Sequence, residues 1–388
     1  MLPLERDEFP LSKKICFLNH GALGVTPQSI WKRVHEINLE TEKNPIHFYD
    51  REGRALFLTV RTKLADYVGS KVSELMVLPN ATYGINAILK SLRFNPGDEI
   101  VITDQEYGAY KRIWADFEQR DGVKVVIACL PVHDPSRDDL LNSVLGCFTN
   151  KTKLLFVSQI TSTTALLLPV QELCARARAT GIMTIVDGAH VPGQIPLNIE
   201  AVGADCYVGN CHKWLYAPRS CGFISLREEF HSDLKPLITS WGPETNPNQY
   251  EPLVDDYAWL GTVNWANYFA LPEALDFHQS VMTSEARAAV AELAQQAYTE
   301  LLALPNVTPV FSRWSEYGLL MFSVHLPIPA EQAQLAYEFL ALQHQIEVQI
   351  GSLGNFSRMR ICINCYNSPE DIDKLMTYLA KALKQFCD

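Results

Sequence analysis

The sequence predicts an α/β protein in which a mostly parallel sheet is covered by helices on both sides, followed by a smaller α+β domain. From about residue 50 to 265, short segments that are apolar throughout alternate with segments of helical periodicity. Strands that are apolar on both faces are typical of parallel sheets buried between two helix layers. After about residue 270, longer helices and separate strands replace this alternation. At 388 residues the chain exceeds one ordinary core, so two domains are expected.

The elements of the first domain follow from local patterns, taken in order along the chain. Residues 53–69 place apolar side chains at helical spacing and end on Gly69, and residues 80–92 show the same helical pattern. The turn NPGDE then leads into the apolar run IVIT. Further strands are expected at residues 123–132, 152–160, 184–187 and 204–209, with a helix at 172–181. The repeated strand and helix pattern indicates a mostly parallel sheet.

The second domain has a different order of elements. A long helix is expected at residues 283–305, strands at 307–311 and 319–326, a helix at 331–343 and a strand at 359–366. The last helix opens with Ser368 as its N-cap and Pro369 in its first turn. Neither a repeat nor a low-complexity linker is visible, so we expect two closely packed domains. The boundaries are placed at 15–265 for the large domain and 266–388, with residues 1–14, for the small one.

Composition and charge narrow the class of protein. Hydrophobic residues make up 47% and charged residues 20%, which is a globular composition, and the net charge of −11 argues against a nucleic-acid partner. The amino terminus has no apolar signal region and no run of about 18 apolar residues occurs, so neither secretion nor a membrane span is expected. Ten cysteines in a chain of this length are read as reduced thiols of a cytoplasmic protein.

Two groups of cysteines are candidates for a metal site. Cys362 and Cys365 form a C-x-x-C, but the surrounding residues read as a strand, in which residues three apart face opposite sides. The second group lacks zinc-finger spacing and consists of Cys206, Cys211, His212 and Cys221. Core packing is the preferred interpretation of both groups, and no metal site is expected.

An acid and an amine stand at the ends of two neighbouring predicted strands. Asp187 closes TIVD, and Lys213 in CHKW follows the strand ADCYVG. Ligands of open parallel sheets bind outside the carboxyl ends of the strands, so both side chains are expected in one crevice. A buried carboxylate and a buried amine are each costly without a partner. A pyridine-aldehyde cofactor satisfies both, because the lysine forms a Schiff base with the aldehyde and the acid keeps the ring nitrogen protonated.

These motifs resemble a known enzyme family. DGAH, followed by a strand and CHKWLYAP, is similar to the pyridoxal-phosphate enzymes of class V aminotransferases, which include cysteine desulfurases and isopenicillin N epimerases. The resemblance runs from FLNHGALG at residue 17 to RICINCYN at residue 360, and NHGALG and QEYGAY look most like the epimerase branch. It implies fold type I, with a seven-stranded, mostly parallel sheet in the large domain, and pyridoxal 5′-phosphate as cofactor.

The resemblance implies roles for residues around the cofactor ring. Lys213 would carry the cofactor as a Schiff base and then take the substrate's Cα proton, and Asp187 would hold the pyridinium nitrogen. His190 matches the position that hydrogen-bonds the phenolic oxygen. Tyr107 falls where desulfurases stack a histidine on the ring, and its hydroxyl would lie on the face opposite the lysine.

The resemblance also implies a phosphate site. Ala81 and Thr82 begin a predicted helix, and free amides at a helix start favour an anion. His212 matches a phosphate ligand of the family, and Asn210 stands where desulfurases commonly have a serine. Gly261 and Thr262 resemble a pair that reaches the phosphate of the neighbouring subunit, which implies a homodimer.

On the substrate side, Arg360 has the family spacing to Tyr366 and Asn367 for the arginine that binds the substrate carboxylate. Arg358 lies two residues earlier on the same strand face and remains the rival. Asn19 and His20 are expected to approach the substrate. Which member of the segment around Thr163 touches the cofactor stays open among Gln159, Thr161 and Ser162.

Several activities remain open. Residues 342–360 contain no cysteine, which disfavours a persulfide-forming desulfurase. Epimerisation or racemisation at Cα would use Lys213 on one face and Tyr107 or a water on the other. β-Elimination from a cysteine-like substrate and transamination share the same first steps. Outside enzyme function, the alternative is a non-catalytic module that binds the cofactor or has a regulatory role on the same fold. A dehydrogenase function has less support, because no strand–G-x-G-x-x-G–helix unit occurs in the sequence.

Overall fold

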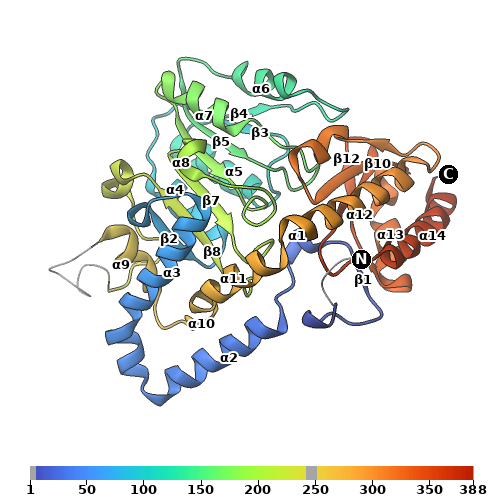
Figure 1. Cartoon of the computed structure of the whole chain (residues 1–388). Helices are drawn as coiled ribbons and strands as arrows, with labels where there is room; N and C mark the ends of the chain where they lie inside the picture. The colour runs from blue at the N-terminus through green and yellow to red at the C-terminus, as the bar shows by residue number, and fades with distance from the viewer. Residues whose placement is uncertain (1–5, 242–250, 388) are drawn as a thin grey trace.

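The computed structural model describes residues 6–241 and 251–387. A larger body built on a central sheet lies beside a smaller body that includes the carboxyl-terminal helix α14 (Pro369–Phe386) (Figure 1). Residues 1–5, 242–250 and 388 fall within the predicted domain ranges but lie outside the described residues. The domain boundaries themselves stay a prediction.

The larger body contains a seven-stranded sheet, as expected. Its strands stand in the order β2-β8-β7-β6-β5-β3-β4, and β8 alone runs antiparallel to its neighbours. The strands are β2 (Leu75–Leu78), β3 (Glu99–Thr103), β4 (Lys124–Ala128), β5 (Thr152–Ser158), β6 (Met183–Asp187), β7 (Cys206–Asn210) and β8 (Gly222–Leu226). Except for β4 at the edge, the strands are buried almost throughout. This confirms the predicted mostly parallel sheet.

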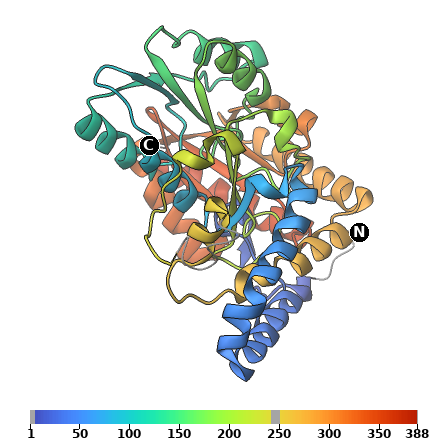
Figure 2. The same cartoon turned by 90° about the vertical axis from the view of Figure 1, so that its left-hand side faces the viewer.

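Helices cover both faces of this sheet, and α2 and α3 project at one end (Figure 2). Asn80 caps α4 by accepting a hydrogen bond from the Tyr83 amide, and Gly69 ends α3 with a φ of +63°. Both helices therefore begin and end where the sequence predicts. The helices that precede α12 (Ser284–Leu302) in the chain are, after α1 (His20–Leu23), α2 (Gln28–Lys43), α3 (Gly53–Val68), α4 (Ala81–Ser91), α5 (Tyr110–Asp121), α6 (Arg137–Leu145), α7 (Val170–Ala179), α8 (Ile199–Val202), α9 (Pro252–Ala258), α10 (Ala266–Phe269) and α11 (Leu271–Val281).

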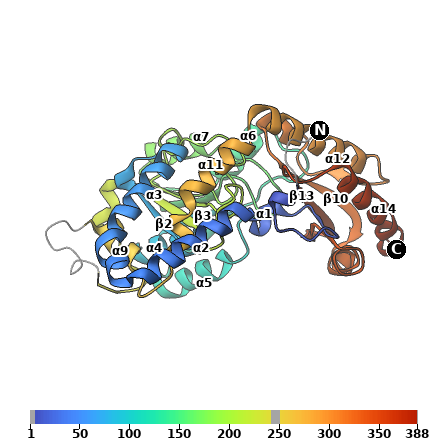
Figure 3. The same cartoon turned by 60° about the horizontal axis from the view of Figure 1, so that its bottom comes forward.

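The smaller body is an α+β unit, as predicted (Figure 3). Its antiparallel sheet has the order β12-β13-β10-β9 and is accompanied by three helices. The elements are α12 (Ser284–Leu302), β9 (Thr308–Pro309), β10 (Met321–Pro329), α13 (Ala333–Glu338), β12 (Gln349–Leu353), β13 (Phe356–Cys362) and α14 (Pro369–Phe386). The strand expected at 359–366 ends at Cys362, because the chain turns just after it: Oδ1 of Asn367 accepts a hydrogen bond from the backbone amide of Asn364.

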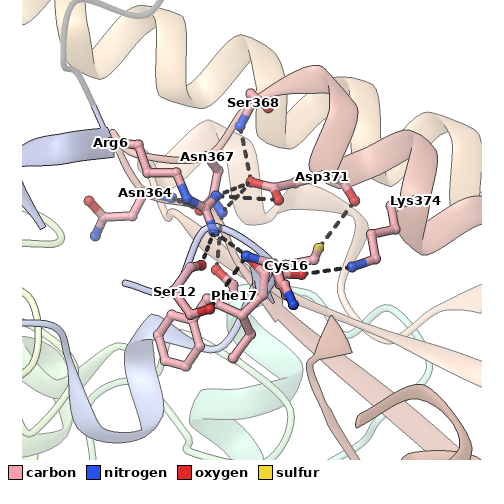
Figure 4. Close-up of polar contacts among 11 residues, drawn as sticks. Arg6, Ser12, Cys16, Phe17, Asn364, Asn367, Ser368, Asp371 and Lys374 are labelled. Atoms are coloured by element: carbon pink, nitrogen blue, oxygen red, sulfur yellow. Dashed lines mark hydrogen bonds and ion pairs between the residues drawn. The ribbon is translucent and has the colours of Figure 1, made fainter. Parts of the chain in front are cut away.

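The amino-terminal segment is bound to the smaller body. Strand β1 (Cys16–Phe17) pairs in parallel with β11 (Ile346–Glu347). Arg6 forms an ion pair with Asp371 of α14 at 3.3 Å, and Asn367 donates to the Phe17 carbonyl at 3.0 Å (Figure 4). The short helix α1 (His20–Leu23) follows directly and lies between the two bodies (Figures 1 and 3). These contacts place the motif FLNHG next to the crevice.

Within the part of the chain that the structure describes, no helix combines the length and apolarity needed to traverse a bilayer.

Candidate active site

A cavity of about 490 Å³ opens at the carboxyl ends of the central strands. Asp187 ends β6, Asn210 ends β7, and the loop from β7 to β8 carries Lys213. Most of the predicted cofactor and substrate residues line this one cavity: Ala81, Thr82, Tyr107, Asp187, His190, Asn210, His212, Lys213 and Arg360. The structure therefore brings together side chains that lie up to 279 residues apart, from Ala81 to Arg360 (360 − 81).

Lys213 presents a reactive amine. Its Nζ lies 3.1 Å from Nε2 of His190. Burial lowers the pKa of Lys213 to about 8, and the charge of Arg360 acts in the same direction, while Asp187 opposes it. A larger fraction of this amine is neutral near pH 7 than for an ordinary lysine, as a nucleophile and base requires. His190 is a neutral imidazole, because burial holds its pKa well below the usual value, and its Nδ1 is buried without a hydrogen-bond partner.

Asp187 is a buried carboxylate with two donors. The Ala189 amide donates to it at 2.8 Å and the Tyr110 hydroxyl at 3.0 Å. Burial raises its pKa, while these donors and the charge of Lys213 favour the ionised form. Tyr110 was missed in the sequence, although it belongs to QEYGAY and stands only three residues after Tyr107.

A second buried acid, Glu106, lies close to Asp187. Glu106 accepts hydrogen bonds from the hydroxyls of Thr103 and Ser158, each at 2.6 Å. Burial raises the pKa of Glu106 to about 7, and the nearby charge of Asp187 adds to this. Sequence reasoning missed this residue too, and the available signal was an acidic residue directly before Tyr107 in QEYGAY.

The predicted phosphate residues gather at the start of α4. The Ala81 amide is not free for an anion as expected, because it donates to Oδ1 of Asn210 at 2.9 Å; Asn210 therefore orients the helix start, and Thr82 lines the cavity beside it. His212 donates from Nδ1 to the Cys221 carbonyl at 3.1 Å, which leaves Nε2 as its second nitrogen. Burial lowers the pKa of His212 to about 4. Thr262 does not line this cavity within the chain; it is exposed in a bend after Gly261.

Of the two rival arginines, Arg360 lines the cavity and Arg358 does not. Arg360 is 1% exposed, donates to Oδ1 of Asn19 at 3.0 Å and also binds the Ser162 carbonyl, and its Nε is buried without a partner. Asn19 therefore positions the guanidinium. Of the three residues left open around Thr163, Ser162 lines the cavity.

His20 occupies a different place from the one expected. Its ring is fully buried and does not line the cavity. Nδ1 bonds to the Tyr366 hydroxyl at 2.8 Å and Nε2 to the Lys213 carbonyl at 2.9 Å. With both nitrogens engaged and a pKa lowered by burial to about 3, His20 holds the main chain of Lys213 rather than approaching a substrate.

Tyr107 stands at the mouth of the cavity. It is 48% exposed and packs edge-on against Tyr110, with ring centroids 5.6 Å apart. It follows β3, whereas Lys213 follows β7, and β5 and β6 lie between these strands. At about 4.8 Å per strand, the two segments begin roughly 14 Å apart along the sheet edge. Lys213 and Tyr107 thus enter one cavity from segments that follow strands three positions apart in the sheet.

The cysteine groups belong to the core. Cys206, Cys211, Cys221, Cys362 and Cys365 all lie in the hydrophobic core, as the packing interpretation predicts. Among residues 6–241 and 251–387, no three His, Cys, Asp or Glu side chains are grouped to hold a metal ion.

The groups in the cavity fit pyridoxal 5′-phosphate. A near-neutral amine matches the aldehyde, a buried carboxylate matches the ring nitrogen, and a helix start with His212 matches the phosphate. The unpartnered Nδ1 of His190 and Nε of Arg360 mark polar atoms left for a ligand. The fold and these groups define a pyridoxal-phosphate-dependent enzyme of fold type I. More specifically, the chain belongs to the aminotransferase class-V family, whose model matches residues 17–375.

Individual relatives have several activities. The chain is 30% identical over 380 residues to isopenicillin N epimerase of Streptomyces clavuligerus, covering 95% of both chains. It is 29% identical over 392 residues to the isopenicillin N epimerase of Amycolatopsis lactamdurans, covering 98% of this chain and 97% of the relative. A solved structure of the cystine C-S lyase C-DES with its product cysteine persulfide has a TM-score of 0.82 at 21% identity, covering 96% and 99% of the two chains.

Proposed function

We propose that the protein epimerises or racemises the Cα of an amino acid or an amino-acid derivative. The observation that carries this proposal is the arrival of Lys213 and Tyr107 in one cavity from opposite ends of a row of four strands. Inversion at Cα needs one group to remove a proton from one face and a second group to return a proton to the other face. The similarity to two isopenicillin N epimerases over nearly the whole chain supports the same reaction class.

Each residue has a defined task in this reaction. Bound pyridoxal phosphate supplies an aldehyde that captures amines and a ring that withdraws electrons from Cα. Arg360 binds the substrate carboxylate through a two-bond fork and so fixes the orientation of the Cα–H bond. Lys213 takes the proton at Nζ, and His190 holds that amine in place. The hydroxyl of Tyr107, or a water beside it, returns a proton on the opposite face.

A second candidate is cleavage of a C–S bond by β-elimination, with transamination as a variant. The names of several relatives, among them L-cysteine desulfhydrase of Arabidopsis thaliana, favour it. A persulfide-forming desulfurase stays disfavoured, because residues 342–360 hold no cysteine and Cys362 is fully buried. Both candidates begin with removal of the Cα proton and differ in where the next proton goes.

The proposal includes a homodimer in the cytoplasm. Thr262 is exposed and lies away from its own cavity, which is the arrangement needed to reach the phosphate of a neighbouring subunit. All ten cysteines are free thiols, in keeping with a reducing compartment. Mixing Lys213→Ala and Thr262→Asp subunits tests the dimer: hybrids regain one intact site if Thr262 acts across the interface. No recovery above the two inactive parents contradicts it.

The reaction is tested by incubating the holoenzyme with a panel of L- and D-amino acids in deuterated water. Solvent deuterium at Cα with loss of chirality supports epimerisation, whereas keto acid or sulfide identifies transamination or C–S cleavage. Lys213→Ala should remove the covalent cofactor adduct seen by mass spectrometry after borohydride reduction. Absence of deuterium exchange with every amino acid in the panel sinks the proposal.

A further inference from the structure

Arg219 is a cation of the active-site cavity whose task has not yet been assigned. It lines the cavity together with Ser220, and both residues are exposed. The other cations that line the cavity already have tasks, Lys213 toward the cofactor's aldehyde and Arg360 toward the substrate carboxylate. Within residues 6–241 and 251–387, no carboxylate forms an ion pair with Arg219. Its charge is therefore available to a ligand of the cavity.

The main chain around Arg219 is held next to a predicted phosphate residue. The Cys221 carbonyl accepts hydrogen bonds from the His212 amide and from Nδ1 of His212, each at 3.1 Å. The Asn267 side chain donates to the Arg219 carbonyl at 2.9 Å. Ser220, which joins Arg219 to Cys221, has a φ of +68°, a left-handed conformation that is typical of ligand sites when the residue is not glycine. Arg219 thus stands two residues from the carbonyl that orients His212.

The same segment lies against the start of α4. Gly222 begins β8, and a Cβ there would come within 2.9 Å of Cα of Asn80 and 3.2 Å of Oδ1 of Asn210. The chain that leads into β8 therefore lies beside the helix start where the phosphate residues gather. Arg219 is also near enough to His212 to affect it. Burial is the largest cause of the lowered pKa of His212, and nearby cations that include Arg219 add to it.

The rest of this end of the cavity is uncharged. Within the described part of the chain, the lining residues around the α4 start, apart from Arg219, are Asn80, Ala81, Thr82, Asn210, His212 and Ser220. The lowered pKa of His212 keeps its imidazole neutral near pH 7. A helix start is equivalent to about half a positive charge, whereas a phosphate monoester carries about −1.5 to −2 near pH 7. A phosphate taken out of water here needs a cation, and Arg219 lines this end.

We propose that Arg219 binds the phosphate of the cofactor and supplies its main counter-charge from this chain. A guanidinium presents two N–H donors to two phosphate oxygens at once, in a fork that combines charge with direction. The inference rests on the predicted phosphate residues and on no particular reaction at Cα. It therefore stands or falls apart from the proposed epimerisation.

The test compares pyridoxal 5′-phosphate with pyridoxal, which has the same ring and aldehyde but no phosphate. Spectroscopic titration of the apoprotein gives a dissociation constant for each compound. In Arg219→Gln the constant for pyridoxal 5′-phosphate should rise about tenfold or more, while that for pyridoxal should stay within about twofold of wild type. The matched control is Arg93→Gln, which removes an exposed arginine that lies outside the cavity and bonds to the Lys90 and Leu92 carbonyls. The control should bind both compounds as wild type does.

The outcomes separate a phosphate ligand from a structural residue. If Arg219→Gln binds both compounds more weakly by the same factor, the residue supports the fold of the loop and the inference is wrong. If the variant keeps the wild-type preference for pyridoxal 5′-phosphate, or wild type has no such preference, the inference is also overturned. Because salt screens charge pairs, added sodium chloride should weaken the binding of pyridoxal 5′-phosphate more in wild type than in Arg219→Gln. Equal salt dependence of the two proteins contradicts a counter-charge at Arg219.

Discussion

Replacing Tyr110 with phenylalanine removes one of the two hydrogen bonds to Asp187 and leaves the ring packing in place. The lost bond is 3.0 Å long, is buried and ends on a carboxylate. Hydrogen bonds to charged groups contribute about 1.5–3 kcal/mol, and about 1.4 kcal/mol corresponds to a factor of ten. Asp187 would then depend on the Ala189 amide, and its pKa, already raised by burial, would rise further.

We therefore expect Tyr110→Phe to bind pyridoxal phosphate roughly ten- to a hundredfold more weakly, since a less ionised Asp187 holds the ring nitrogen less well. The assay is a spectroscopic titration of apoprotein with cofactor, and the matched control is Tyr83→Phe. The Tyr83 hydroxyl is buried without a partner, so its removal breaks no hydrogen bond. If both variants bind the cofactor within twofold of wild type, Tyr110 does not support Asp187 and the assignment of the acid is wrong.

Three further outcomes are expected. Arg360→Lys should raise KM for amino acids about ten- to a hundredfold, because lysine cannot form the two-bond fork with the carboxylate, while cofactor affinity should stay within about twofold of wild type. An equal loss of substrate affinity and cofactor affinity would contradict the substrate role of Arg360. The rate at which the apoprotein binds cofactor covalently should rise with pH and level off above about pH 8. The reason is that the neutral form of Lys213 is the nucleophile and its pKa is lowered to about 8. A rate that keeps rising up to pH 10 would show that the pKa of this lysine is not lowered. Gly24→Ala should lower the thermal midpoint and impair cofactor capture, because Gly24 has a φ of +68° and its Cβ would come 1.9 Å from the His212 carbonyl. Gly97→Ala is the control, since Gly97 also has a positive φ (+90°) but a Cβ there meets nothing within 4 Å. If both variants lose the same thermal stability and cofactor capture, a specific effect of Gly24 on the loop that carries Lys213 is excluded.

The fold was largely predictable because buried strands and amphipathic helices differ in period. The runs that became β5, β6 and β7 are mostly apolar and buried, and their ends carry Asp187 and lead into Lys213. β8 was not among the strands expected by residue range, and its direction could not be predicted either, since an apolar run such as GFISL has the same composition in either orientation. β12 was missed because five residues with a central glycine carry little periodic signal.

The sequence predicted the site residues that stand at the ends of strands, but not the residues whose role is to hydrogen-bond to another side chain of the site. The acid and the amine meet as expected, but the support from Tyr110 depends on the angle of α5, which no local pattern encodes. The ring of His20 turns toward Tyr366 and the Lys213 carbonyl, a choice made by packing. Arg358 and Arg360 share a strand face, so alternation alone leaves them equivalent, and only their depth along β13 distinguishes them.

The attachment of the amino-terminal segment affects how the two bodies can move. Leu18 accepts a hydrogen bond from the Cys362 amide at 2.9 Å, while two residues later His20 joins Tyr366 to the main chain of Lys213. A displacement of β13 would therefore reach the reactive amine through the chain from Leu18 to His20 and the hydrogen bond from His20 to the Lys213 carbonyl. Deleting residues before position 20 should uncouple that transmission and inactivate the enzyme, although none of the deleted side chains touches the reacting atoms.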